Sequence, residues 1–302
     1  FKQKTAYEIM PSLVGSEMCI RDSYCHREGE TSSSTEMTVG EIVEIVKLGV
    51  DLGIRSVKLT GGEPLVREDI LEIVKGISEI KGIKDLSMTT NGTLLSKCAE
   101  KLVNAGLNRV NISLPTLDES KYRKITGGEL SQVTSGIKAA VNAGLNPVKL
   151  NMVYLKGVNT DEVYSMIDFA AETGTILQVI ELEPINLGDE FYLKHHEPLN
   201  DLIEYLAGKA KEIKVRSDMQ NRKIYILPEA RVEVIPPIEN TEFCRHCTRI
   251  RLTSDGKLKP CLMRQDNLVD ILTPMRMGAD KDALKKLFIE AIKRREPYFK
   301  GR

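Results

Sequence analysis

Residues 54–64 read Ile-Arg-Ser-Val-Lys-Leu-Thr-Gly-Gly-Glu-Pro, and the fold class can be inferred from this stretch. A β-strand is predicted over 54–60, because apolar Val57 and Leu59 alternate with polar Lys58 and Thr60, and Gly61-Gly62-Glu63-Pro64 ends the strand in a loop. Helical periodicity follows over about 67–80. We therefore expect the strand–loop–helix unit of a parallel sheet, with the glycine loop at the carboxyl end of the strand, where such folds bind ligands. Taken alone, the tetrapeptide could equally be an ordinary turn.

The same alternation of strand and helix extends on both sides of this unit. Thr38 and Glu41 form a capping box at the start of the first regular helix. Helices are predicted at 38–50, 67–80, 94–105, 119–125, 132–143 and 160–173, and strands at 54–60, 85–89, 109–114, 147–154 and 177–183. Strands that alternate with helices predict a parallel sheet. The 302 residues allow one barrel-sized domain with an appendage, or two ordinary domains.

The predicted strands carry one apolar and one polar face. Strands of a parallel sheet that is covered on both faces are usually apolar throughout, so the alternation needs another explanation. An antiparallel sheet with one wet face would also alternate, but the intervening helices argue against it. We therefore predict an α/β fold, a partial (βα)6-type TIM barrel whose polar lumen forms the binding site. The polar face comprises Lys58, Thr60, Ser87, Thr89, Asn111, Ser113, Lys149, Asn151, Glu181 and Glu183.

Three cysteines in the C-terminal part of the chain are spaced as C-x2-C-x13-C. Cys244 and Cys247 can grip one metal centre from a single turn, and the hairpin turn at Asp255-Gly256 returns Cys261 to them. Structural zinc sites normally use four protein ligands, and His246, inside the C-x2-C, is poorly placed to be the fourth. Three thiolates suit a [4Fe–4S] cluster with one iron open to a ligand that is not protein. A zinc knuckle completed by water or a distant ligand is the alternative.

The composition excludes several broad classes of function. The 43 Lys and Arg residues balance 43 Asp and Glu residues, so no net charge points to nucleic acid or to a membrane surface. No apolar run is long enough to span a membrane, and no secretory pattern opens the chain. Six cysteines, three of them in one motif, suit a reducing compartment. We expect a cytoplasmic protein that binds neither nucleic acid nor membrane, and a homodimer would be compatible with the sequence.

The regular alternation of strand and helix ends at about residue 184. Residues 184–198 are predicted to be a loop in which His195 and His196 are solvated. The remaining predicted elements are a helix at 199–210, a hairpin of 223–227 with 231–235, and a helix at 280–294.

Six segments occur in the order that they take in one enzyme family. They are residues 24–30, 58–65, 89–92, 111–114, 147–151 and 243–262. Over roughly residues 24–300 the sequence resembles the radical S-adenosylmethionine (SAM) GTP 3′,8-cyclases of molybdenum-cofactor biosynthesis. Residues 24–30, Tyr-Cys-His-Arg-Glu-Gly-Glu, are similar to the archaeal branch of that family.

The resemblance implies a radical SAM barrel with two [4Fe–4S] clusters. An N-terminal cluster with one open iron would bind SAM and cleave it reductively to a 5′-deoxyadenosyl radical. That radical would take hydrogen from C3′ of GTP, and the ribose carbon would bond to C8 of guanine, giving (8S)-3′,8-cyclo-7,8-dihydroguanosine 5′-triphosphate. The C-terminal cluster would offer its open iron to the guanine. The implied partners are GTP, SAM, an electron donor and the next pathway enzyme, which accepts the cyclised product.

The resemblance also assigns site residues by their positions in the family motifs. Those implied to contact SAM are Tyr24, Gly62, Glu63 and Ser113. Those implied to contact GTP are Lys58, Thr89, Lys149, Arg249, Ile250 and Arg251, of which Lys58, Arg249 and Arg251 are the catalytic candidates. The implied metal ligands are Cys25 in the first cluster and Cys244, Cys247 and Cys261 in the second. A triphosphate needs several cations, and guanidinium forks suit phosphate oxygens. The alternative for the two arginines is a solvated hairpin edge.

The resemblance begins abruptly at Tyr24. The family holds its first cluster with C-x3-C-x2-C, and if Cys25 is the last of these thiols, Met18 and Asp22 stand where the other two belong. Cys19 is one residue out of register. Residues 1–23 fit neither strand nor helix well, and we expect them to be a non-native segment. One thiolate cannot hold a [4Fe–4S] cluster, so we expect no SAM cleavage by the chain as written.

The expected organisation is a non-matching segment 1–23, the barrel 24–183, and a C-terminal region 184–302 with the second cluster and the GTP site. Glu183 and Thr248 replace a methionine and an asparagine that are common in the family, and the Gly-Gly tail of many relatives is missing. Two other functions stay open: a radical SAM peptide maturase with an auxiliary cluster, and a non-catalytic, one-cluster GTP-binding protein. The Arg-x-Arg after the second thiol and the lumen lysines favour a nucleotide over a peptide.

Overall fold

The computed structural model describes residues 8–11, 36–184, 189–216, 220–238 and 241–296. Up to β6, these residues alternate strands with helices. The strands are β1 (Glu8–Pro11), β2 (Ser56–Leu59), β3 (Asp85–Thr90), β4 (Arg109–Ser113), β5 (Val148–Tyr154) and β6 (Ile176–Glu181). The helices are α1 (Val39–Asp51), α2 (Ile70–Ser78), α3 (Leu95–Asn104), α4 (Glu119–Thr126), α5 (Leu130–Asn142) and α6 (Val163–Thr173), with 3₁₀ turns η1 (Pro64–Val66) and η2 (Thr160–Glu162).

The C-terminal part adds strands to both ends of the sheet. Its strands are β7 (Glu212–Arg216), β8 (Arg222–Ile226), β9 (Arg231–Ile235), β10 (Arg249–Leu252), β11 (Lys257–Lys259) and β12 (Val269–Asp270). Its helices are α7 (Asp189–His195), α8 (Asn200–Lys209), α9 (Thr241–Arg245), α10 (Leu272–Arg276) and α11 (Lys281–Lys293).

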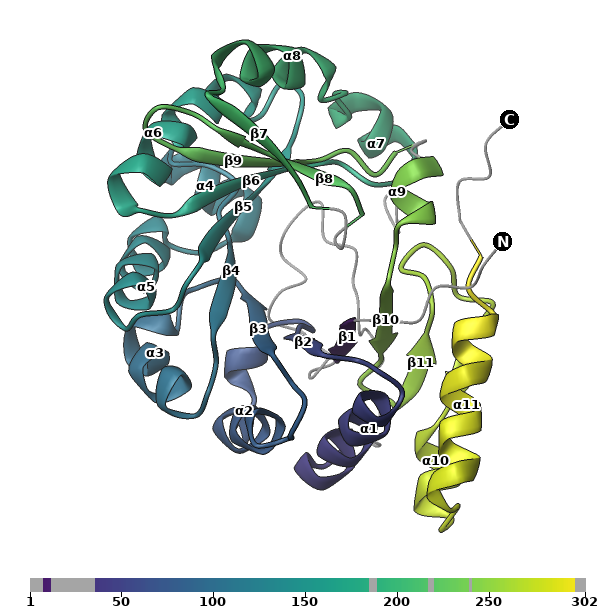
Figure 1. The fold of residues 1–302 in the computed structure, drawn as a ribbon. Helices are drawn as coiled ribbons and strands as arrows, with labels where there is room; N and C mark the ends of the chain where they lie inside the picture. The colour runs from purple at the N-terminus through teal and green to yellow at the C-terminus, as the bar shows by residue number, and fades with distance from the viewer. Residues whose placement is uncertain (1–7, 12–35, 185–188, 217–219, 239–240, 297–302) are drawn as a thin grey trace.

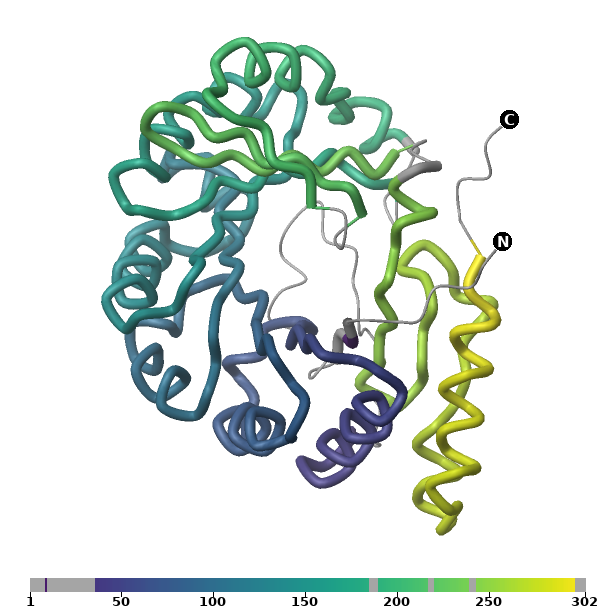
Figure 2. Tube along the Cα trace, in the orientation of Figure 1, coloured from purple at the N-terminus to yellow at the C-terminus, as the bar shows by residue number. Residues whose placement is uncertain are grey.

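These strands form one curved sheet in the order β12-β11-β10-β1-β2-β3-β4-β5-β6-β9-β8-β7. Neighbours from β10 to β9 are parallel, and antiparallel pairs extend the sheet at both ends. The helices that connect the parallel strands lie outside the curve (Figure 1). The Cα trace passes around the barrel from α1 to α8 and finally brings α11 back beside α1 (Figure 2). The predicted partial barrel is confirmed.

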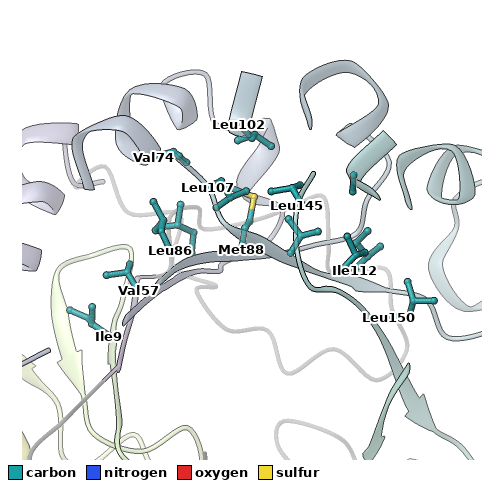
Figure 3. Packing of buried hydrophobic residues seen from close by; sticks show 14 of the residues in the cluster. Ile9, Val57, Val74, Leu86, Met88, Leu102, Leu107, Ile112, Leu145 and Leu150 are labelled. Atoms are coloured by element: carbon teal, nitrogen blue, oxygen red, sulfur yellow. The ribbon is translucent and has the colours of Figure 1, made fainter. Parts of the chain in front are cut away.

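The convex face of the sheet is packed against the helices. Figure 3 shows Val57, Leu86, Ile112 and Leu150 in the cluster between the strands and the surrounding helices, and all four are buried. Because successive residues of a strand point to opposite faces, the polar residues that alternate with these four point into the concave side.

The first regular helix begins as the sequence predicts. Thr38 Oγ1 accepts a hydrogen bond from Glu41 N at 3.3 Å, and Glu41 Oε2 accepts one from Thr38 N at 2.8 Å. This reciprocal capping box satisfies two backbone donors that the first turn leaves without a helical partner.

Glycine is required where α5 crosses the loop after β3. A Cβ at Gly136 would lie 2.1 Å from the carbonyl oxygen of Gly92. Gly92 itself has a φ of +80°, and a Cβ there would lie 2.7 Å from Ile112 Cγ2. Because neither position carries a side chain, α5 can lie close to the loop at the carboxyl end of β3.

Two predictions about secondary structure are wrong. Residues 8–11 form β1, although the sequence predicts no strand in 1–23, and Ile9 is fully buried. A strand of four residues is too short for its apolar–polar pattern to predict it from sequence. The pairing of β1 with β10 and β2 supplies the hydrogen bonds that hold it. The predicted loop at 184–198 contains α7. His196 is not solvated there, because its Nε2 lies 2.9 Å from Glu181 Oε1.

Candidate active site

Five polar side chains of the sequence prediction lie on the concave face. Strand register places Lys58 beside Ser87, Thr89 beside Asn111, and Asn111 beside Lys149. Residues two apart in a strand share a face, so all five lie toward the lumen. Lys58 and Lys149 are only 7% and 4% exposed. This burial excludes the interpretation of the two lysines as surface charges.

The lumen residue of β6 differs from the predicted one. Asn111 Nδ2 donates a hydrogen bond to Gln178 Oε1 at 3.0 Å, which fixes Gln178 on the concave face. Glu181, three positions later, therefore lies on the opposite face, beside His196. Burial raises the pKa of Glu181, against the effect of His196. The prediction that Glu181 faces the lumen is wrong, because pairing with β5 places Gln178 beside Asn151.

A buried carboxylate that the sequence analysis missed lies among three cations, Lys149, Arg216 and Arg222. Glu233 of β9 has no exposed surface and forms an ion pair with Lys149 through Oε2. Its other oxygen lies 3.8 Å from Arg222 and 3.9 Å from Arg216. Burial raises the pKa of Glu233, but Lys149, Arg222 and Arg216 together bring it below its usual range. In the sequence Glu233 reads as the polar residue of a hairpin, and its alternation with Val232 and Val234 was the available signal.

β10 brings both arginines of the Arg-x-Arg motif to the same concave face. Residue 8 of β1 pairs with both Arg249 and Ser56, and residue 10 pairs with Arg251. Because Lys58 follows Ser56 by two positions, Arg249, Arg251 and Lys58 share one face. Ile250 points the other way and is fully buried, so its backbone is the part that a ligand in the lumen could contact.

The Gly-Gly-Glu-Pro loop is tied to the next strand through Glu63. Gly61 has a φ of +133°, which favours glycine there. The Glu63 carboxylate is 1% exposed and accepts hydrogen bonds from Thr90 Oγ1 at 2.6 Å, Asn91 N at 2.6 Å and Leu65 N at 3.1 Å. Burial raises the pKa of Glu63 in spite of these three donors. The carboxylate therefore joins the loops after β2 and β3.

The other residues assigned to SAM and the first cluster are only partly described. Gly62 and Ser113 lie at the carboxyl ends of β2 and β4, and both are half-buried. The residues of this group outside the described ranges are Met18, Cys19, Asp22, Tyr24 and Cys25.

The three cysteines of the C-terminal motif come together from separate elements. Cys244 lies in α9, Cys247 follows it before β10, and Cys261 follows β11. Burial raises the pKa of the Cys261 thiol, Arg251 lowers it, and Cys247 and Cys244 raise it further. The three sulfurs are therefore within electrostatic range of one another. His246 Nδ1 instead lies 3.2 Å from Asn221 Nδ2.

The environment of these thiols fits an iron–sulfur cluster. In the parts of the chain that the structure describes, no three Cys, His, Asp or Glu side chains converge closely enough to hold a single metal ion. Arg251 acts on Cys261, and Arg295 acts on Cys247 and Cys261, so two cations face the thiols. Such charge suits a cluster held by three thiolates, which is anionic.

Two family models match the chain. The Radical SAM superfamily matches residues 23–170, and Molybdenum Cofactor Synthesis C matches residues 175–301. A probable GTP 3′,8-cyclase of Methanococcus aeolicus is 49% identical over 280 residues, which cover 92% of this chain and 91% of the relative. The chain belongs to the radical SAM GTP 3′,8-cyclase family. A second member, from Methanothermobacter thermautotrophicus, is 47% identical over 278 residues, or 91% of this chain and 90% of the relative.

Two solved structures share the fold of this chain. Streptococcus suis SuiB bound to S-adenosylmethionine superposes with a TM-score of 0.65 at 22% identity, covering 85% of this chain and 60% of SuiB. Native anSMEcpe with bound AdoMet gives a TM-score of 0.56 at 17% identity, covering 85% of this chain and 74% of its own. SAM and iron–sulfur chemistry follow from membership of the radical SAM superfamily. None of the described helices is long and apolar enough to cross a membrane.

Proposed function

We propose that this chain is built to bind GTP in the barrel lumen as a GTP 3′,8-cyclase of molybdenum-cofactor biosynthesis. One observation carries the proposal: four cations from three strands, Lys58 of β2, Lys149 of β5, and Arg249 and Arg251 of β10, share the concave face. A triphosphate carries several negative charges, and guanidinium forks match pairs of its oxygens. A peptide substrate would not need this concentration of positive charge.

The remaining residues take roles that the family positions suggest. Cys244, Cys247 and Cys261 would hold the second cluster, Gly62 and Ser113 would face SAM, and Glu63 would hold the loop that carries Gly62. A first cluster with SAM, when bound, would supply the radical chemistry that acts on C3′ of GTP. Around that chemistry, the lumen cations neutralise and orient the triphosphate, and the buried concave face excludes water. An electron donor and a following enzyme that accepts the product are required partners of this reaction.

We further propose that the chain as written holds only the second cluster. Met18 and Asp22 stand where the family pattern has thiols, and a single thiolate at Cys25 cannot hold a cubane. In this form the chain would bind GTP without cleaving SAM, as a one-cluster nucleotide-binding protein. Replacing residues 1–23 by a segment with C-x3-C-x2-C that ends at Cys25 should then restore SAM cleavage.

The proposal is tested by anaerobic reconstitution followed by iron and sulfide analysis. We expect about four iron atoms per chain, the content of one cubane cluster. Cys261→Ser should lose this iron, whereas the matched control Cys98→Ser should keep it. Cys98 lies in α3, where its thiol donates a hydrogen bond to Leu94 O. About eight iron atoms per chain would show that the first cluster also forms. If Cys261→Ser kept all of the iron of the parent, the assignment of Cys261 to the second cluster would be contradicted.

GTP binding is measured on the reconstituted chain by isothermal titration calorimetry. Lys58→Met and Arg251→Met should each weaken binding at least tenfold, since a charge-assisted hydrogen bond contributes about 1.5–3 kcal/mol. Arg123→Met, which changes an exposed arginine of α4, is the matched control and should bind as the parent does. Equal affinity in all four proteins would refute the lumen as the GTP site.

A further inference from the structure

Arg295 ties the end of the last helix to the three-cysteine motif. It lies two residues beyond α11, and its guanidinium donates from Nη1 to Cys247 O at 3.3 Å and from Nη2 to Arg249 O at 2.6 Å. These carbonyls flank Thr248, between the second thiol and β10. A side chain from the C-terminal end of the described chain thus supports the segment that presents both a thiol and a lumen arginine.

The Nε–H of this guanidinium has a different environment from Nη1 and Nη2. Arg295 Nε is buried and finds no hydrogen-bond acceptor among the residues that the structure describes. A buried donor without an acceptor costs free energy, and more so on a charged group. Burial lowers the pKa of Arg295, while the charges of Cys247 and Cys261 raise it. The unpaired Nε–H therefore belongs to the guanidinium that binds the backbone of Cys247, one of the proposed cluster ligands.

We propose that Arg295 is a positioning residue of the second cluster, which supports Cys247 through the backbone and directs its Nε–H toward a sulfur of that cluster. The inference rests on the proposed function, because it requires a cluster held by Cys244, Cys247 and Cys261. Reduction adds an electron to an already anionic group. A buried cation with a donor to sulfur stabilises the reduced state more than the oxidised one, and so raises the reduction potential.

A purely structural role would give a different result, and the neighbouring Arg294 provides the comparison. Arg294 also ties the helix end, because its Nη1 donates to Leu268 O at 2.9 Å. It pairs with the exposed Glu290. Arg294→Met therefore removes a comparable tether without removing a charge beside the thiols.

The test is a redox titration of the reconstituted full chain, followed by electron paramagnetic resonance. With a single cluster expected in this chain, the signal needs no separation from a second one. In Arg295→Met the ratio of reduced to oxidised cluster at a fixed potential should fall about tenfold, which is about 59 mV for a one-electron couple. Arg295→Lys, which keeps the charge, should shift less, and Arg294→Met should titrate as the parent does.

The outcomes separate this inference from the proposed function. If the parent takes up no iron, both are overturned. If Arg295→Met holds a full cluster at the parental potential, Arg295 is only a tether and the inference is overturned. If Arg295→Met takes up no cluster, the parent chain is labelled with ¹⁵N-arginine and its reduced cluster is examined for a coupling to nitrogen. A nitrogen coupling that disappears in Arg295→Lys supports the inference. The absence of such a coupling in the parent refutes it.

Discussion

Glu233→Ala tests whether one buried carboxylate organises the cations of the lumen. Glu233 has no exposed surface, contacts Lys149 through one oxygen, and holds Arg222 and Arg216 at 3.8 and 3.9 Å from the other. Alanine at this position would leave three positive charges facing one another with no anion between them. We expect a large loss of stability in the absence of GTP.

The size of this loss follows from the geometry. Two unit charges 3.8 Å apart attract each other by about 4 kcal/mol at an effective dielectric constant of about 20. Removal of one partner from a buried pair costs about 3–5 kcal/mol, because the remaining charge stays buried without compensation. At about 2–4 °C per kcal/mol, the melting temperature should fall by about 6–20 °C.

Circular dichroism of the ligand-free chain during thermal and urea unfolding measures this change. The control is Glu129→Ala, which breaks the exposed ion pair with Arg123 and should change stability far less. The pKa of Glu233 is lower in the folded chain than in the unfolded chain. Glu233 therefore stabilises the fold at pH values above the ordinary pKa of a carboxyl group, and this stabilisation is lost as the pH falls through the pKa of the folded state. The difference between parent and variant should therefore shrink in acid. A Glu233→Ala variant that melts with the parent at neutral pH would refute the reasoning.

Three further substitutions test other parts of the barrel. Gly136→Ala should destabilise by about 1–3 kcal/mol in urea, because its Cβ would overlap the Gly92 carbonyl, and an unchanged midpoint would contradict this packing. Thr38→Ala should cost about 1 kcal/mol by removing the cap of α1, and equal stability would exclude the capping box. Because the pKa of Glu63 is raised in the folded chain, protonated Glu63 stabilises the fold at pH values below the ordinary pKa of a carboxyl group. This stabilisation is lost as the pH rises through the pKa of the folded state. Urea unfolding between pH 4 and pH 8 should thus show the parent losing stability relative to Glu63→Gln, and parallel pH profiles would contradict the prediction.

Local patterns were sufficient to predict much of the barrel and its site. The inward position of Lys58 and Lys149 follows from alternation within strands that helices separate, because only a polar lumen reconciles the two. The placement of Cys244, Cys247 and Cys261 around one hairpin follows from their spacing. In both cases, the deciding information lies within a few neighbouring residues.

The missed features depend on pairing between distant segments. Gln178 and Glu181 differ by three positions, so only the register with β5 decides which one faces the lumen. Glu233 becomes significant because β9 joins β6, across the insertion of two helices and a hairpin. Arg295 reads as one of several basic residues near the end of the chain. Its role depends on a contact with Cys247 that no local pattern encodes.

The position of β1 between β2 and β10 has a consequence for synthesis of the chain. Residues 8–11 leave the ribosome long before residues 249–252, with which they pair. At about 5–20 residues per second, β1 would wait about 10–50 s for that neighbour. During this time the growing sheet ends in a strand with one open edge, and such edges invite pairing with other chains. Chaperone capture of nascent chains should therefore decline once β10 has been translated.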